Sequence, residues 1–83
     1  MSSKEKLIKR FCRFPSDFTF EELTRLFGLL GYVLDSKGVT SGSRVSFSKG
    51  KARYCMHKPH PRIIVRKTIL KDIYLYLSEQ GLL

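Results

Sequence analysis

The sequence has few features of secreted, membrane-spanning or cofactor-binding proteins. It contains only two cysteines, Cys12 and Cys55, in 83 residues. Two thiols do not make a disulfide framework, and reduced cysteine is the usual state in the cytoplasm. The chain is polar after Met1, and no apolar run is long enough for a signal peptide or a membrane span. We therefore expect a cytoplasmic protein without a membrane partner.

The motifs of several enzyme classes are also missing. There is no glycine-rich phosphate loop, and Ser43 has no base and acid pattern around it that would indicate a serine nucleophile. A chain this short builds one small domain with a modest core, which leaves little room for a large cofactor. Cys55, His57 and His60 offer three metal-ligand types, but a fourth is missing and cations surround them. We expect neither a cofactor nor a metal.

Acidic residues are absent from a long central segment. The chain has 16 Lys and Arg against 7 Asp and Glu, a formal charge of +9, yet no acid occurs from Ser36 to Lys71. The segment contains Lys37, Arg44, Lys49, Lys51, Arg53, Lys58, Arg62, Arg66, Lys67 and Lys71. Clustered cations displace counterions from phosphates, so this imbalance favours a nucleic-acid partner over a merely solvated surface.

Hydrophobic spacing predicts six elements. They are helices over 3–14, 20–30 and 68–80 and extended segments over 32–35, 44–48 and 52–58. Thr19 and Glu22 form a capping-box pattern for the second helix, and Gly31 is a typical stop. The first helix is basic and amphipathic, which fits either packing on the core or weak contact with a membrane.

The element order predicts an α+β domain of two layers, with helices on one face of a three-stranded antiparallel sheet. Apolar Val45, Phe47, Tyr54 and Met56 alternate with Arg44, Ser46, Arg53, Cys55 and His57 along the last two strands. If the apolar set faces the helices, Arg44 and His57 share the uncovered face. The short link around Gly50 predicts a hairpin between these strands.

An imidazole beside a guanidinium suits chemistry on RNA. Neutral His57 can take the proton of a 2′-hydroxyl, Arg44 can balance charge on the phosphate, and His60 can protonate the leaving oxygen. Phosphate or base contact without catalysis explains the same residues, as does a strand end closed by Pro59. The pattern alone leaves these alternatives open.

Four blocks of sequence resemble the HicA-type toxins, small mRNA-cleaving partners in type II toxin–antitoxin pairs. The blocks are Asp17-Phe18-Thr19-Phe20-Glu21-Glu22-Leu23, Leu30-Gly31-Tyr32, Gly42-Ser43-Arg44-Val45-Ser46-Phe47 and His57-Lys58-Pro59-His60-Pro61. The resemblance implies a single domain over 1–83, with a core over 17–83 and an N-terminal helical extension over 1–14. It also implies a fold like a double-stranded-RNA-binding domain, ribosome-independent mRNA cleavage, and neutralisation by a HicB-type antitoxin.

One departure from the family pattern concerns the catalytic residue. Better-known members have Gly-Ser-His, and Arg44 stands here in place of that catalytic histidine. The interpretation is therefore an endoribonuclease with His57 as base, His60 as acid and Arg44 as the phosphate-stabilising cation. The residues expected to hold RNA are Lys37, Ser43, Lys49, Lys51, Arg53 and Lys58. The alternatives are an inactive RNA-binding module of the same fold and an interaction protein that recruits an acidic partner.

Overall fold

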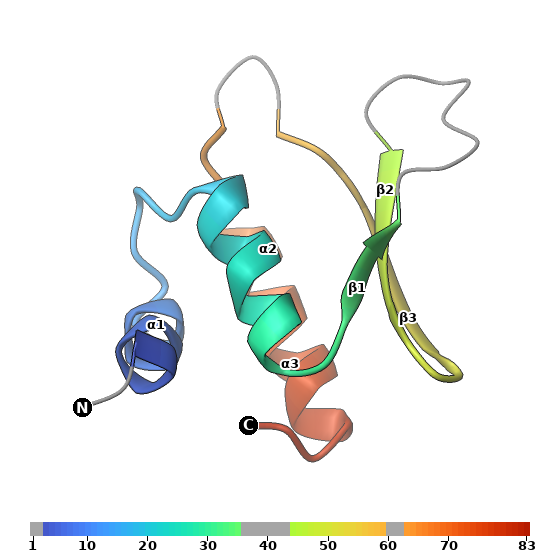
Figure 1. The fold of residues 1–83 in the computed structure, drawn as a ribbon. Coiled ribbons are helices and arrows are strands. Elements are labelled where there is room, and N and C mark those ends of the chain that lie inside the picture. Colours follow the sequence, from blue (N-terminus) through green and yellow to red (C-terminus); the bar gives the residue numbers. More distant parts are fainter. Residues whose placement is uncertain (1–2, 36–43, 60–62) are drawn as a thin grey trace.

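The computed structural model describes residues 3–35, 44–59 and 63–83. Its elements are α1 (Ser3–Cys12), α2 (Phe20–Leu29), β1 (Val33–Asp35), β2 (Arg44–Lys49), β3 (Ala52–His57) and α3 (Lys67–Glu79) (Figure 1). This order confirms the predicted α+β fold class. No helix in the described ranges is long and apolar enough to cross a membrane.

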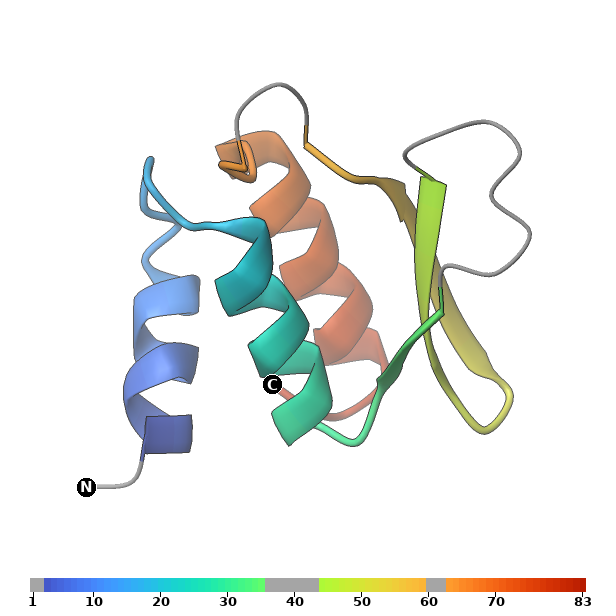
Figure 2. The same ribbon diagram turned by 45° about the horizontal axis from the view of Figure 1, so that its top comes forward.

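The sheet is antiparallel and its strands lie in the order β1-β2-β3. Helices α2 and α3 lie on one face of it, and no helix of the described residues covers the other face (Figures 1 and 2). Gly50, with φ 59°, is the first residue of the two-residue turn between β2 and β3, where type II′ turns require glycine. The predicted hairpin is confirmed.

The ends of α2 follow from local sequence. The Thr19 hydroxyl accepts from the amide of Glu22 at 3.1 Å, and the Glu22 carboxylate accepts from the amide of Thr19 at 3.0 Å. At the other end Gly31 has φ 93°, which lets the amide of Tyr32 donate to the carbonyl of Phe27 at 2.8 Å. The predicted capping box and glycine stop are both confirmed.

Helix α1 ends two residues before the predicted boundary. Phe14 precedes Pro15, which disfavours the helical conformation, and Phe14 has a left-handed φ of 50°. Its ring packs edge-on against Tyr74 of α3, with centroids 5.6 Å apart. The chain thus reverses at Phe14, and α1 lies against α2 on the side away from the sheet (Figures 1 and 2).

The core is aromatic and joins the helices to the covered face of the sheet. Phe27 of α2 stacks on Phe47 of β2 with centroids 4.1 Å apart. Tyr54 of β3 donates a hydrogen bond of 2.7 Å to the Asp72 carboxylate of α3. The largest fully buried side chains are Phe11, Phe18, Phe27, Phe47, Leu23, Leu26, Leu70, Ile73, Leu77 and Val65. Burying one such side chain contributes about 1.5–3 kcal/mol to folding.

Candidate functional site

The uncovered face of the sheet, here called the open face, carries the polar side chains of β2 and β3. Directly paired residues of antiparallel strands project to the same side. Arg44 pairs with His57, Ser46 with Cys55, and Ser48 with Arg53, while the intervening Val45 and Phe47 are buried under the helices. Strand β1 adds Val33 and Asp35, which pair with Ser48 and Ser46. The predicted side-chain alternation is confirmed.

Arg44 and His57 are the central pair of this face. They are cross-strand partners, so their Cβ atoms start about 4.5–5.5 Å apart. Both residues are exposed, and within the described ranges neither side chain forms a hydrogen bond or an ion pair. A guanidinium and an imidazole are thus available together on the open face. Both could contact one phosphodiester group without any rearrangement of the backbone.

The strand sequences account for this availability. Ser46 and Ser48, the next open-face residues after Arg44, have short side chains that leave room for long neighbours. Pro59 follows β3 two residues after His57 and cannot donate to a ladder, so pairing ends there. His57 therefore lies at the end of its strand, where a ligand can approach from the open face and from the strand end.

Asp35 is a residue of this face that sequence reasoning missed. It pairs with Ser46, which lies two residues along β2 from Arg44 and therefore on the same face. Diagonal neighbours on a sheet lie within reach of a long side chain such as arginine. The acid-free segment begins at the next residue, Ser36, so the charge pattern did not include Asp35. The burial of Tyr32-Val33-Leu34-Asp35 does not alternate, so the pairing of β1 with β2, rather than a sequence pattern, places Asp35 on this face.

The residues expected to hold RNA divide into three groups. Arg53 lies on the open face, and Lys51 is exposed in the hairpin turn. Lys49 points the other way, where its ammonium donates to the carbonyl of Leu30 at 3.0 Å, at the C-terminus of α2. The remaining expected site residues Lys37, Ser43 and His60 lie outside the described residues.

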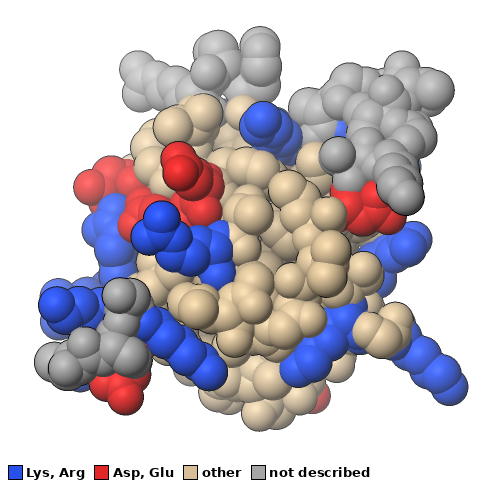
Figure 3. All heavy atoms as spheres, in the orientation of Figure 1, with Lys and Arg blue, Asp and Glu red and all other residues tan. Residues whose placement is uncertain are grey.

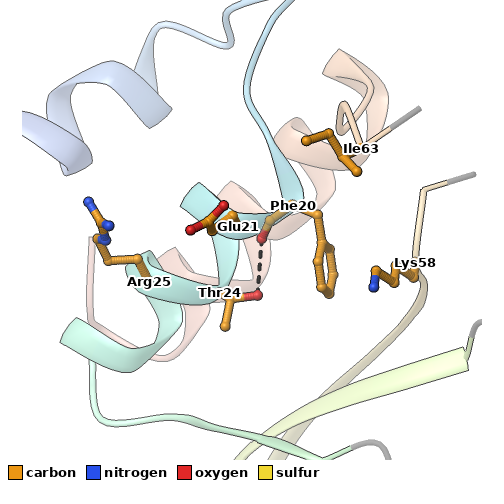
Figure 4. A pocket seen from close by; sticks show the side chains of 6 residues that line it. All are labelled: Phe20, Glu21, Thr24, Arg25, Lys58 and Ile63. Carbon is orange, nitrogen blue, oxygen red and sulfur yellow. Dashed lines mark hydrogen bonds between the residues drawn. The ribbon is translucent and has the colours of Figure 1, made fainter.

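Lys58 turns to the helix side of β3 and helps to form a hollow of about 460 Å³. Its ammonium lies 5.6 Å from the centroid of the Phe20 ring. Figure 4 shows Phe20 and Ile63 between Lys58 on one side and Glu21, Thr24 and Arg25 on the other. Ile63 is 55% exposed. The hollow has an apolar floor and charged walls, and it begins one residue beyond His57.

The tyrosines between the sheet and α3 do not supply a base. Burial raises the pKa of Tyr54 well above its ordinary value, and the hydrogen bond that it donates to Asp72 raises it further. Burial, with a hydrogen bond from Tyr32, raises the pKa of Tyr76 to about 12. Both phenols stay neutral near pH 7 and hold β3, α3 and the end of α2 together. His57 is left as the candidate base on the open face.

The open face holds two of the three residues in the predicted Cys-His-His pattern. Cys55 and His57 lie on the same side of β3, and His60 is outside the described residues. Among the residues with described positions, no three His, Cys, Asp or Glu side chains form a group suited to a metal ion.

The geometry defines a class of protein: an α+β domain with one packed sheet face and one cationic, uncovered sheet face. Comparison of the chain with protein-family models, with curated proteins and with solved structures yields no match.

Proposed function

We propose that this protein is a HicA-like toxin, an endoribonuclease that binds and cleaves mRNA and is held inactive by a HicB-type antitoxin in the cytoplasm. The observation that carries the proposal is the direct pairing of Arg44 with His57 on the open face. The acid-free basic segment and the sequence blocks described above support the choice of RNA as substrate. A fold like that of double-stranded-RNA-binding domains is part of the same proposal.

The proposed reaction is an internal transesterification. Neutral His57 takes the proton of a ribose 2′-hydroxyl, whose oxygen forms a bond to the adjacent phosphorus. Arg44 donates to the phosphate oxygens and balances their charge as the bond to the 5′-oxygen breaks. An acid, proposed to be His60, gives that oxygen a proton. The products are a 2′,3′-cyclic phosphate and a 5′-hydroxyl, and no metal ion or cofactor takes part.

The open face also suits the proposed antitoxin. No helix of the described residues covers it, and Arg44 and Arg53 give it a positive charge. A partner with an acidic surface would be attracted to it and would exclude RNA by occupying the same cations. One surface would then explain both activity and its neutralisation.

A second candidate is an inactive RNA-binding module of the same fold. It is favoured by Arg44 itself, because the family resemblance implies a catalytic histidine at that position. Binding without cleavage would use the same cations of the open face, and it would require no acid and no base. The two candidates differ only in whether a product forms.

The test is cleavage of a labelled RNA by the purified chain. We expect a product that ends in a 2′,3′-cyclic phosphate, and no product from the same RNA with 2′-O-methyl groups. His57→Ala should reduce the rate by about 100- to 10,000-fold because a positioned base is lost. Cys55→Ser, an exposed neighbour on the same strand face, is the matched control and should cleave normally.

Unchanged cleavage by His57→Ala would remove the assigned base. Binding of RNA by the wild-type chain without any product, with binding weakened in Arg44→Gln, would establish the second candidate instead.

A further inference from the structure

A second cationic surface lies on α1, apart from the sheet. Lys6, Lys9 and Arg10 of α1, and Arg13 directly after its end, recur at spacings of three and four residues, which places them on one side of the helix. Together with Pro15 they line a hollow of about 340 Å³, and no acidic residue contributes to its wall. This set of residues is called the α1 hollow below.

The four cations of the α1 hollow are not equivalent. Arg10 is held by two carboxylates: its Nε lies 2.7 Å from Glu22 and its Nη2 lies 3.0 Å from Asp17. Lys6, Lys9 and Arg13 are exposed and form no ion pair with any residue in the described ranges. Arg10 thus fixes the wall of the hollow, while three positive charges remain uncompensated around it.

The other side of α1 is not available for insertion into a membrane. Leu7 is 8% exposed and Phe11 is fully buried, and the Phe11 ring lies 5.8 Å from that of Phe18. An amphipathic helix binds a lipid surface through its apolar side, and here that side packs on the core. Of the two explanations that the sequence allows for this helix, packing on the core is the one observed.

The spacing of the free cations fits a phosphate backbone. Seven residues separate Lys6 from Arg13, a distance of about 10 Å along a helix that rises about 1.5 Å per residue. That length corresponds to about three nucleotide steps at about 3.4 Å per step along one strand. A protein partner is a poorer fit, because lysine is depleted in protein interfaces and the hollow offers no large apolar anchor.

The α1 hollow and the open face are far apart. Helices α2 and α3 lie between α1 and the sheet in both ribbon views (Figures 1 and 2), and the longest extent of the molecule is 40 Å. In Figure 3 the blue atoms of lysine and arginine gather over α1 at one end and around the β2–β3 hairpin at the other, with a broad tan region between them. A short nucleic-acid segment cannot occupy both surfaces at once.

We propose that the α1 hollow is a second binding site for the phosphate backbone of nucleic acid, in which Lys6, Lys9 and Arg13 each contact a phosphate. The site is independent of catalysis on the open face. It lets one chain hold two separate segments of nucleic acid, one at each end of the molecule.

The test measures binding to a fluorescent, single-stranded 2′-O-methyl RNA of 20 nucleotides over a series of salt concentrations. This RNA lacks the 2′-hydroxyl, so the result does not depend on cleavage. The combined variant Lys6→Gln, Lys9→Gln, Arg13→Gln should bind more weakly. Its slope of log affinity against log salt should be less steep by about 2, because each lost contact with a single strand removes about 0.7.

A matched control separates local contact from net charge. Arg25→Gln, Arg66→Gln, Lys67→Gln removes the same three charges from exposed positions outside both surfaces. Arg66 and Lys67 belong to the acid-free segment but lie outside both surfaces, so this variant should flatten the slope clearly less than the hollow variant does. All six side chains are exposed, and equal melting temperatures would verify that both variants are folded.

Equal slopes for the two triple variants would overturn the proposal. A second result would also overturn it. If the hollow variant keeps its RNA affinity but loses binding to vesicles of phosphatidylserine, the α1 hollow binds lipid headgroups instead. If uncleavable RNA shows the expected slopes while natural RNA yields no product, the proposed catalysis fails and the second site stands.

Discussion

The two faces of the β2–β3 hairpin have the same backbone and opposite surroundings. On one face Val45 and Phe47 are buried under α2 and α3, and Phe47 is completely covered. On the other face Arg44 and His57 are exposed directly opposite each other. Alternate residues of β2 are therefore either buried in the core or exposed on the open face. If the proposed function holds, substitutions on the covered face should change stability, and those on the open face should change RNA binding alone.

The largest expected effect is on the covered face, at Phe47. Its ring is fully buried and stacks on Phe27, so Phe47→Ala should lower the free energy of unfolding by about 3–5 kcal/mol. Urea unfolding followed by circular dichroism measures this loss. Ser48→Ala, the next residue on the open face, should change it by less than about 0.5 kcal/mol. Similar losses of unfolding free energy in Phe47→Ala and Ser48→Ala would show that the two faces do not differ in their contribution to stability.

An intermediate effect is expected for the partly buried phenol of Tyr54. Its folded-state pKa is raised by burial and by the bond to Asp72, whereas the unfolded chain ionises near the ordinary value of 10. The unfolded state therefore loses its proton first, and stability falls as pH rises above about 10. At neutral pH Tyr54→Phe should cost about 0.5–1.5 kcal/mol through the lost hydrogen bond.

The pH dependence gives the sharper comparison for this residue. Melting temperatures from pH 8 to pH 11 should fall less steeply in Tyr54→Phe than in the wild type. Identical slopes would show that this phenol does not titrate differently in the folded and unfolded states.

The smallest expected effect on stability is at Arg44. The side chain is exposed and has no partner among the described residues, so Arg44→Gln should change the free energy of unfolding by less than about 0.5 kcal/mol. The same variant should weaken RNA binding and flatten its salt dependence, with a slope change of about 0.7 for one phosphate contact. Arg44→Lys is the control that preserves charge. A large loss of stability would mean that Arg44 supports the fold.

Local rules predicted much of this architecture. The capping box at Thr19 and Glu22, the glycine stop at Gly31 and the alternation along β2 and β3 depend on residues close in sequence, and all three are present. The same alternation puts Lys49 on the side of Phe47, and Lys58 on that of Tyr54. Charge alone grouped both lysines with the open-face cations, which explains why their orientation was not anticipated.

Other features depend on contacts between distant segments. Phe18 is fully buried, and its carbonyl accepts from the amide of Val65 at 2.7 Å, next to an isolated bridge between Thr19 and Ile64. No sequence pattern around Phe18 or around Val65 predicts that these two segments pair. The position of α1 likewise follows from Phe14, whose left-handed backbone reverses the chain and brings its ring to Tyr74. Such contacts become visible only when the elements are assembled.

The two-residue turn at Gly50 has a consequence at the other end of the hairpin. In a tight turn the number of residues sets the pairing of both strands, and a shift of one residue sends every side chain to the opposite side. An insertion beside Gly50 would therefore bury the imidazole or separate it from its guanidinium partner, although no residue of the pair had changed. For this hairpin, related sequences would have to keep the length of the turn as strictly as they keep Arg44 and His57, the two residues that the turn aligns.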